Sequence, residues 1–302
     1  MQMVSVVIPT HNRCDLITRA ISSVIKQTYK DLEILVVSDG STDDTKDVVK
    51  RLAAEDERIK LIEYHPSKGG NVARNTGIEM ASGEYVAFLD DDDEWLPEKL
   101  EKQLAVMEAD SDIGLVYTGT RIIYVNEKVT YSFNPKAKGD LSKEILLDNS
   151  IGTTSTVMAR KDILIKAGLF DTELRALQDF DLWIRLCQMC KVGMVCEEMI
   201  NYYNYVGTNQ ISALTDKYID SFAYINDKYK DLLNELSSEQ LQEKKHNEYM
   251  LLGNKAMRNG NGKLARKFIK AALKERRSKK ALAYYLLSFT NFKTVLKLRS
   301  IC

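Results

Sequence analysis

The sequence predicts an α/β fold with a parallel sheet, followed by an all-helical C-terminal region. Over the first 117 residues, short apolar runs rich in β-branched residues alternate with segments whose apolar residues recur at helical spacing. Strands that alternate with helices imply βαβ units with right-handed crossovers. From about Thr215 onward, apolar residues recur at i, i+3 and i+4, which is the helical pattern. A chain of 302 residues is long enough for one large domain with a small appendage.

The α/β part contains five predicted strands alternating with helices. Pro9 closes the first apolar run, the capping residues Ser41 and Thr42 precede the second helix, and Pro97 suits the first turn of the fourth. The expected strands are 3–8, 32–37, 59–63, 85–89 and 113–117, and the expected helices are 16–25, 43–54, 71–81 and one starting at Pro97. Ligands of such sheets bind where the strands end, which directs attention to 9–13, 38–42, 65–70 and 90–94.

The pattern changes after residue 117. We expect a hairpin of strands 121–125 and 128–133 turned at Asn126-Glu127, helices at 161–167 and 180–190, and a strand at 194–203. The C-terminal helices are expected at 216–234, 238–259, 261–275 and 279–297. We therefore divide the chain into an α/β domain, residues 1–210, and a helical subdomain, residues 211–302.

Charge and hydropathy narrow the class of protein. Lys and Arg number 43 and so do Asp and Glu, so the basic excess of a typical nucleic-acid-binding protein is absent. No apolar run reaches the roughly 18 residues that indicate a transmembrane helix. The start, MQMVSVVIPTHNR, lacks the charged region and the cleavage site of a signal peptide. We therefore expect a cytoplasmic protein that does not bind nucleic acid.

The cysteines argue against a disulfide framework, because they are odd in number and scattered. Cys187 and Cys190 form a C-x-x-C, but no His and no second pair accompany them, so ordinary thiols are favoured over a metal or redox site. The five are Cys14, Cys187, Cys190, Cys196 and Cys302.

The sharpest local feature is YVAFLDDDDEW, where an apolar strand ends in four consecutive aspartates, Asp90 to Asp93. In an extended chain, Asp90 and Asp92 would point to one side and Asp91 and Asp93 to the other. Neighbouring carboxylates at the end of a buried strand repel unless they share a cation, and their oxygens suit magnesium or manganese together with substrate phosphates. The alternative is a solvated acidic loop at the start of the next helix, whose dipole favours negative charge.

Two further segments follow predicted strands. In ILVVSDGSTDDT, Asp39 comes directly after its strand and could accept hydrogen bonds from a nucleobase or a ribose; the alternative is a turn that Gly40 permits. In HPSKGGNVARNTGIEMASG, Lys68 precedes a helix and Arg74 lies in its first turns, so backbone donors and cations favour an anion. The alternative there is an ordinary loop and helix.

These motifs together resemble glycosyltransferase family 2, the inverting enzymes of the GT-A fold. The ordered motifs are VSVVIPTHNR, VVSDGSTDDT, KGGNVARNTGI, FLDDDDEWLPEKLEKQ and GLFDTELRALQDFDLWIRL, and they cover residues 3 to about 205. The resemblance implies a Rossmann-like GT-A nucleotide-diphospho-sugar transferase fold and a divalent cation, manganese or magnesium. It also implies a nucleotide-sugar donor, expected to be UDP-linked, from which a hexosyl or N-acetylhexosaminyl group moves to an acceptor hydroxyl. We expect a glycan or lipid-linked acceptor, in surface polysaccharide or glycan biosynthesis.

The resemblance assigns nucleotide-binding roles to five residues of the first three motifs. Pro9 and Thr10 would line the nucleotide pocket, and Asp39 would contact the base. Lys68 and Arg74 would approach the nucleotide.

The resemblance also assigns roles to the acids. In the Asp-x-Asp motif, Asp90 would contact the ribose and Asp92 would bind the metal directly; Asp91 is counted with the nucleotide-binding residues, and Asp93 extends the motif. The family's catalytic base is the acid of a Glu-Asp pair, which reads Gln178-Asp179 here, so Asp179 would deprotonate the acceptor.

The base assignment has competitors within the same segment. Asp181 competes for the role, and Asp179 could instead be an ordinary acid at a helix N-terminus. This chain also departs from the family pattern, because Arg13 and Gln178 stand where many members have acids.

Two other functions fit parts of the pattern. A nucleotidyltransferase would need a glycine-rich triphosphate loop after the first strand, which IPTHNRCDL lacks. A non-catalytic nucleotide-sugar-binding protein would not need Asp179. The Q-x-x-R-W motif of processive synthases is missing from the sequence, which indicates single transfer rather than polymerisation.

The C-terminal segment RKFIKAALKERRSKK, followed by ALAYYLLSF, interleaves basic and apolar residues, as in a helix lying on an anionic membrane. The alternative, which the sequence favours, is a solvated basic face over a packed core. If the helices contact a membrane, replacing Lys279 and Lys280 with Glu reduces liposome binding.

Overall fold

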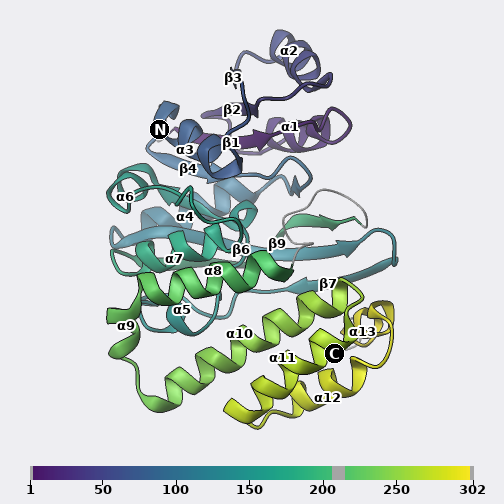
Figure 1. The fold of residues 1–302 in the computed structure, drawn as a ribbon. Helices are drawn as coiled ribbons and strands as arrows, with labels where there is room; N and C mark the ends of the chain where they lie inside the picture. The colour runs from purple at the N-terminus through teal and green to yellow at the C-terminus, as the bar shows by residue number, and fades with distance from the viewer. Residues whose placement is uncertain (1–2, 206–214, 300–302) are drawn as a thin grey trace.

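The structure, a computed structural model, describes residues 3–205 and 215–299. The sheet runs through the upper and middle parts of the view in Figure 1, and the C-terminal helices gather below it. The predicted boundary between residues 210 and 211 lies outside the described residues, so the division into two domains remains a prediction.

Four parallel strands form the first half of the sheet. β1 lies between β2 and β4, and β3 pairs with β2 on the outer side. Continuous apolar runs suit strands that are covered on both faces, and β1, β2 and β4 are buried along their whole length. The strands are β1 (Val4–Thr10), β2 (Leu32–Asp39), β3 (Ile59–Tyr64) and β4 (Tyr85–Phe88), linked through the helices α1 (Ile17–Ile25), α2 (Thr45–Glu55) and α3 (Gly70–Met80). The predicted βαβ units are therefore present.

The second half of the sheet is mixed. β8 pairs antiparallel with both β4 and β6, so it separates β6 from the parallel block. The strands are β5 (Glu94–Trp95), β6 (Ile113–Tyr124), β7 (Val129–Phe133), β8 (Met158–Arg160) and β9 (Lys191–Asn204), and the shorter helices are α4 (Lys99–Ala109), α5 (Glu144–Leu147), the 3-10 helix η1 (Thr154–Thr156), α6 (Lys161–Lys166) and α7 (Gln178–Cys187).

The prediction of two separate strands at 113–117 and 121–125 is wrong, because β6 is one strand of 12 residues. Its pairing with β9 shifts register on both sides of Gly119. A side chain at Gly119 would approach the backbone oxygen of Glu197 to 2.7 Å, so glycine lets the two strands come together at this irregularity. The predicted hairpin between β6 and β7 is present.

Pro9 does not end the first strand, which continues to Thr10. The backbone N–H of Leu89 donates to Val7 O at 3.1 Å, so Val7 and Pro9, two residues apart, face the side of β4. β4 ends at Phe88, opposite Val7, and therefore the missing N–H of Pro9 costs no ladder hydrogen bond.

The predicted cap of α2 is also wrong. Ser41 accepts a hydrogen bond from Asn12 N, and Thr42 N donates to the Asn12 side chain, so both residues tie the β2 loop to the β1 loop. The Asp43 carboxylate instead accepts the backbone N–H of Thr45 at 3.0 Å, where α2 begins.

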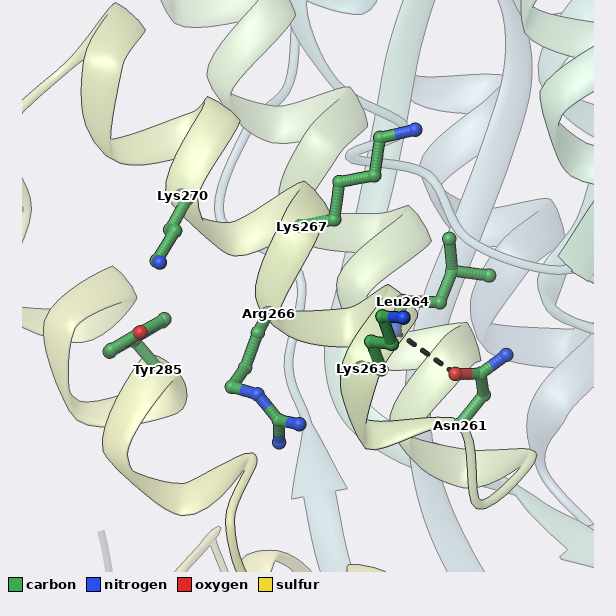
Figure 2. Close-up of a pocket in the computed structure, with 7 residues that line it drawn as sticks. All are labelled: Asn261, Lys263, Leu264, Arg266, Lys267, Lys270 and Tyr285. Carbon is green, nitrogen blue, oxygen red and sulfur yellow. Dashed lines mark hydrogen bonds between the residues drawn. The ribbon is translucent and has the colours of Figure 1, made fainter.

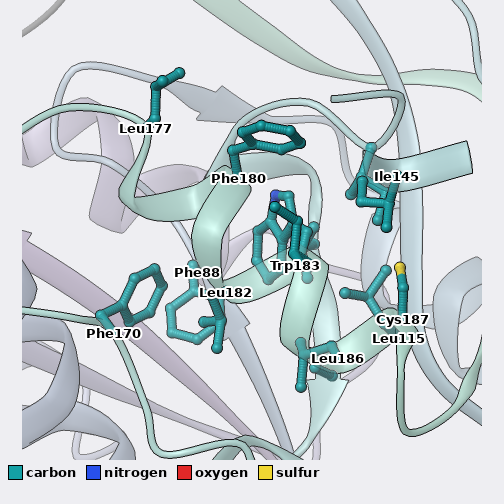
Figure 3. Packing of buried hydrophobic residues seen from close by; sticks show 14 of the residues in the cluster. Phe88, Leu115, Ile145, Phe170, Leu177, Phe180, Leu182, Trp183, Leu186 and Cys187 are labelled. Carbon is teal, nitrogen blue, oxygen red and sulfur yellow. The ribbon is translucent and has the colours of Figure 1, made fainter. Parts of the chain in front are cut away.

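Buried side chains pack on the two faces of the sheet. Within β1, Val6 and Ile8 enter one cluster and Val7 enters the other, as the alternation of a strand requires. Figure 3 shows part of the cluster on the Val7 face. The ring centroids of Phe88 and Phe170 lie 5.4 Å apart, and those of Phe170 and Trp183 lie 6.5 Å apart.

Trp183 fixes the position of α7 against the sheet. Its side chain is fully buried, and its indole N–H donates to Gly152 O at 3.0 Å. Because a buried polar donor needs a partner, this bond sets the orientation of the ring as well as its depth. The start of α7, which carries Asp179, is thereby held in place.

The C-terminal helices are more finely divided than expected. The predicted helices 216–234 and 279–297 are each divided into two helices. The break in the second lies at 288–291, where the Asn291 side chain accepts the Thr294 N–H at 3.0 Å. They are α8 (Thr215–Lys228), α9 (Lys230–Asn234), α10 (Ser238–Arg258), α11 (Gly262–Glu275), α12 (Lys279–Leu287) and α13 (Phe292–Arg299).

The first C-terminal helices share the core of the sheet. Tyr218 and Phe222 of α8 and Leu252 of α10 belong to the same buried cluster as Trp183. α10 to α13 also have a cluster of their own, which includes Ile269. The first cluster therefore holds α8 and α10 against the α/β part, and the second joins α10 to the helices that follow it.

Residues 3–205 and 215–299 include no helix that is both long and apolar enough to cross a membrane. Cys14, Cys187, Cys190 and Cys196 are free thiols, as expected without a disulfide framework, and Cys302 lies outside the described residues.

Candidate active site

Asp39 organises the loop that covers the end of β2. Its carboxylate accepts the backbone N–H groups of Lys68 at 2.6 Å and Gly69 at 2.9 Å, and the Ser67 hydroxyl at 2.7 Å. Burial alone would raise the pKa of Asp39, but these donors outweigh it and hold the pKa below its usual range. Gly40 permits the close approach, because a side chain there would lie 2.5 Å from Ser67 N.

The backbone and the side chain of Lys68 make different contacts. The Lys68 side chain is exposed and lies over the Tyr64 ring, with Nζ 5.2 Å from the ring centroid. Its backbone N–H is the group that joins Asp39.

The four aspartates form a turn after β4 rather than an extended segment, since Asp93 N donates to Asp90 O at 3.1 Å. Their burial still alternates: Asp91 and Asp93 are buried, whereas Asp90 and Asp92 are partly exposed. The two partly exposed carboxyl groups are those of the predicted Asp-x-Asp pair.

Arg74 joins α3 to this turn. It is buried, and its guanidinium donates to the Asp90 carboxylate at 2.6 Å, while the Thr154 hydroxyl lies 3.2 Å from both Asp90 oxygens. The other guanidinium nitrogens, Nε and Nη1, are buried without a hydrogen-bond partner within the described residues. A guanidinium with spare donors beside a partly exposed carboxylate suits the oxygens of a phosphate group.

Asp91 and Asp93 are crowded carboxyl groups. Burial, and then the charge of Asp92, raise the pKa of both, that of Asp91 to about 7. Asp93 is held by the Ser155 hydroxyl at 2.7 Å. Arg13 Nε lies 3.9 Å from an Asp91 oxygen, so the basic residue that departs from the family pattern offsets part of this negative charge.

The oxygen donors fit a divalent cation that is shared with a substrate. In 3–205 and 215–299, no group of three or more His, Cys, Asp or Glu side chains is arranged to hold a metal by itself. Magnesium and manganese are commonly held by one or two carboxylates together with substrate phosphates. Asp92, with Asp90 beside it, matches that donor set.

Asp179 is the second residue of α7 and is partly exposed. Burial raises its pKa to about 6; the Phe180 N–H, which donates to it at 2.7 Å, and the charge of Arg74 lower the pKa, and Asp90 raises it. The charges of Arg74 and Asp90 thus act directly on Asp179. Leu177, just before the helix, has φ +58°, an unfavourable backbone conformation for leucine that fixes how α7 enters the site.

Asp181 has a different environment. It is fully buried, and its carboxylate binds Arg185 at 2.6 Å, the Tyr229 hydroxyl at 2.7 Å and Lys228 Nζ at 2.7 Å. These contacts tie α7 to α8. A carboxylate fully occupied in this way cannot also approach an acceptor, so the geometry favours Asp179 over Asp181 as a base.

The C-terminal helices add residues that sequence reasoning missed. Lys255 Nζ of α10 donates to the Tyr218 hydroxyl of α8 at 2.9 Å and lies 4.3 Å from the centre of its ring. The charge of Asp179 raises the pKa of both side chains, so they lie within electrostatic range of the candidate base. Burial, and then the charge of Arg258, lower the pKa of Lys255 to about 7.

Lys255 has no carboxylate within ion-pair distance among residues 3–205 and 215–299. The sequence gives little indication that Lys255 lies near the site. Lys255 and Arg258 are three residues apart, which is a common spacing on the face of any helix. Tyr202 of β9 lies in the same neighbourhood. Burial is the largest cause that raises its pKa, and the charges of Asp93 and Asp92 and the Tyr218 side chain raise it further.

The structure brings most of the predicted residues to one edge of the sheet. Thr10 and Asp39 are the last residues of β1 and β2, and the 90–93 turn follows β4. Arg74 connects this turn to the neighbourhood of Asp179. Pro9 and Thr10 are buried at this edge.

Known proteins resemble this chain in sequence. The glycosyl transferase family 2 model matches residues 5–168. An uncharacterized glycosyltransferase of Haemophilus influenzae is 32% identical over 190 residues, which is 62% of each chain. The UDP-Glc:alpha-D-GlcNAc-diphosphoundecaprenol beta-1,3-glucosyltransferase WfgD of Escherichia coli is 32% identical over 217 residues, covering 70% of this chain and 82% of WfgD. The matches to glycosyltransferases of Rickettsia felis and Rickettsia conorii span only 34% and 33% of those longer proteins.

Solved structures match the fold. TarS of S. aureus superposes with a TM-score of 0.63 at 18% identity, over 100% of this chain and 53% of TarS. The mannosyltransferase PcManGT from Pyrobaculum calidifontis, in complex with GDP-Man and Mn²⁺, superposes with a TM-score of 0.62 at 17% identity, over 99% of this chain and 86% of PcManGT. At these identities the likeness concerns the fold alone, and it confirms the predicted GT-A fold. With the family model matching more than half of its length, the chain belongs to glycosyl transferase family 2.

Proposed function

We propose that this protein transfers a single sugar from a nucleotide-diphosphate sugar, with UDP as the nucleotide, to an acceptor hydroxyl with inversion at the anomeric carbon. The observation that carries the proposal is the neighbourhood of Arg74, Asp90 and Asp179. It sets a guanidinium with spare donors and a raised-pKa carboxyl group at one edge of the sheet. The UDP-glucose named for WfgD and the UDP complex of TarS support the choice of nucleotide.

The donor is held at the strand ends. In this proposal the loop that Asp39 organises shapes the base pocket, and the Asp90 carboxylate accepts a ribose hydroxyl. The positive charge of Arg74, whose buried Nη1 and Nε have no hydrogen-bond partner within the described residues, would attract the diphosphate. A manganese or magnesium ion bound at Asp92 would stabilise negative charge on the departing diphosphate.

Asp179 acts as the base. As the acceptor oxygen forms its bond to the anomeric carbon, its proton passes to the Asp179 carboxylate and the bond to the diphosphate breaks, which releases the nucleoside diphosphate. Attack opposite the leaving group inverts the configuration. A carboxyl group with a pKa of about 6 is ionised at neutral pH and is a stronger base than an ordinary aspartate.

The acceptor side supports a phosphate-bearing acceptor. Lys255 is a partly buried cation beside Asp179 without a carboxylate partner in the described residues, and Arg258 is three residues further along α10. Both would attract an anion near the acceptor hydroxyl. WfgD is named for an acceptor whose sugar is joined to undecaprenol through a diphosphate, and TuaG of Bacillus subtilis for teichuronic acid biosynthesis. A lipid-linked acceptor at the cytoplasmic face of a membrane, in surface polysaccharide assembly, agrees with this chemistry.

The first experiment is a calorimetric titration of UDP with manganese and with a chelator. Wild type should bind UDP in manganese, and Asp92→Ala should lose most of this binding because Asp92 would hold the cation that stabilises the diphosphate. Asp112→Ala, an exposed aspartate before the start of β6 at the opposite edge of the sheet, is the matched control and should bind like wild type.

UDP binding that is equal with and without manganese, and equal in Asp92→Ala, would contradict the metal assignment. If UDP does not bind at all, the same titration with GDP and dTDP identifies the nucleotide. Inversion is then tested from the anomeric configuration of the product by NMR.

A further inference from the structure

The charge of the chain is divided unevenly. Although Lys and Arg balance Asp and Glu at 43 each over the whole sequence, residues 261–302 contain twelve basic residues and one acid, Glu275. Residues 1–260 therefore carry an equally large excess of acidic over basic residues. A segment with one sign of charge creates a field that attracts a partner of the opposite sign.

Part of this charge lines a surface cavity of about 580 Å³. Four cations of α11 line it, together with Tyr285 of α12. In Figure 2, Lys270 extends toward Tyr285, whereas Lys267 points away from it. The lining residues are Asn261, Lys263, Leu264, Arg266, Lys267, Lys270 and Tyr285, none of which is acidic.

No carboxylate of the described residues neutralises the positive charge of the lysines that line the cavity. Lys263, Lys267 and Lys270 form no ion pair within the parts of the chain that the structure describes. Arg266 donates to Ser288 O at 3.0 Å and stacks 4.5 Å from the centre of the Phe289 ring, which leaves its positive charge without a carboxylate. Four like charges around one cavity favour an anion with several oxygens, such as a phosphate ester.

An exposed apolar row lies beside the cavity. Leu282 is 53% exposed, Leu286 62% and Phe289 64%. Their spacing of four and three residues puts them on one face of α12 and the turn that follows it. The Arg266–Phe289 stack and Lys270, 5.5 Å from the Tyr285 ring centre, join this row to the cations. Large exposed side chains grouped in this way indicate an interaction surface.

We propose that α11 and α12 form a docking surface for an anionic lipid bilayer. Lipid phosphates occupy the α11 cavity, and Leu282, Leu286 and Phe289 enter the boundary between headgroups and acyl chains. The inference deepens the proposed function and rests on it for the lipid-linked acceptor, since docking brings the enzyme to the surface where that acceptor lies. A nucleic acid or a free acidic polymer would satisfy the cations but would leave the apolar row in water, whereas a bilayer satisfies both.

The test is co-sedimentation of the full chain with vesicles. Wild type should bind vesicles of phosphatidylcholine with about one third phosphatidylglycerol and should bind neutral vesicles at least about tenfold less, because each cation near the surface adds to the attraction. The double variant Lys267→Glu with Lys270→Glu should lose about tenfold or more in binding to anionic vesicles. Leu286→Ser with Phe289→Ser should also bind weakly, and its remaining binding should be abolished by salt because only the charge contribution is left.

The matched control reverses two charges elsewhere: Lys230→Glu with Lys245→Glu, exposed lysines of α9 and α10, should bind vesicles like wild type. Three results would overturn the proposal. Wild type could bind neutral and anionic vesicles equally, or the control could lose as much binding as the cavity variant. Inorganic polyphosphate could also abolish vesicle binding completely while the Leu286 and Phe289 changes have no effect. UDP titration of every variant separates the two proposals: vesicle binding without UDP binding would count against the donor site alone, and UDP binding without vesicle binding against the docking surface alone.

Discussion

At the strand ends, two of the acids form ion pairs with arginines of the protein, whereas the cations of α11 have no carboxylate partner among the described residues. Asp90 is bound by Arg74 and Asp91 lies near Arg13, so part of the negative charge at this edge is offset within the protein. Lys263, Lys267 and Lys270 lie on one helix, and none of them forms an ion pair within residues 3–205 and 215–299. The difference indicates that a substrate at the strand ends replaces contacts within the protein. The lysines of α11 are instead available to an anionic partner outside the protein.

The two regions also differ in how they are held. The strand-end site is fixed by hydrogen bonds from several elements, as at Asp39 and Asp93. The α11 cavity is built on one helix and the facing residues of α12, so its charges can be altered with little effect on the fold. Substitutions at the strand ends should therefore affect catalysis, and substitutions on α11 should affect docking.

The largest effect is expected from Asp179→Asn. The amide cannot accept the acceptor proton, so the rate of transfer should fall by roughly 10²–10⁴-fold, the usual contribution of a general base. UDP affinity should change little, because the donor site does not include this side chain. Transfer is measured as UDP released in the presence of an acceptor, and a variant with near wild-type turnover would show that another group is the base.

Asp181→Asn should affect stability instead of chemistry. The substitution leaves Arg185 and Lys228 without their buried carboxylate, and breaking a buried ion pair from one side costs about 3 kcal/mol or more. Thermal unfolding should therefore show a clearly lowered Tm. Activity per folded molecule should stay within about threefold of wild type at low temperature, because Asp181 does not touch the acceptor. A loss of turnover without a loss of stability would exchange the roles of the two aspartates.

The pH dependence of transfer should have an acid limb and an alkaline limb. Asp179 must be ionised to accept a proton, so the rate should fall as the pH drops below about 6. Lys255 must be charged to attract an acceptor phosphate, so kcat/KM for that acceptor should fall as the pH rises above about 7. Arg74, Asp90, Tyr218 and Arg258 also face these groups, so the limbs report apparent values for the coupled set.

Lys255→Met makes that prediction specific. It should remove the alkaline limb and raise KM for a phosphate-bearing acceptor by about tenfold, as expected for the loss of one charge-assisted hydrogen bond. The acid limb should remain and move to higher pH, because removing a nearby positive charge raises the pKa of Asp179. The same alkaline limb in wild type and in Lys255→Met would show that Lys255 does not contact the acceptor.

The sequence predicted the α/β order and the strand-end acids well because those signals are local. β1, β2 and β4 are mainly apolar runs, Asp39 is the last residue of β2, and Asp90 comes two residues after the end of β4. β5 and β8 were missed because two and three residues show no periodicity. The choice between Asp179 and Asp181 was open because the two lie on one short segment, and only the packing of Tyr229 and Lys228 against α7 distinguishes them.

Lys255 could not have been found from its neighbours in the sequence. It reaches the site because α8 and α10 pack into the core of the sheet, which is a tertiary contact between segments more than 70 residues apart in the chain. In the same way, the C-terminal sequence indicated basic and apolar residues together, but only the structure distinguishes buried apolar residues, such as Ile269, from exposed ones, such as Leu286.

The smallest effect is expected from Lys279→Glu with Lys280→Glu. Both lysines are exposed at the start of α12, outside the α11 cavity, so they add to the attraction of a bilayer without binding a lipid phosphate in the cavity. Binding to anionic vesicles should fall by roughly three- to tenfold, which is less than for Lys267→Glu with Lys270→Glu. The two double variants carry the same change of net charge, so equal losses measured side by side by co-sedimentation would mean that total charge alone matters. A larger loss for the cavity variant is the result that requires a phosphate site on α11, because only a local site makes the position of the charge count.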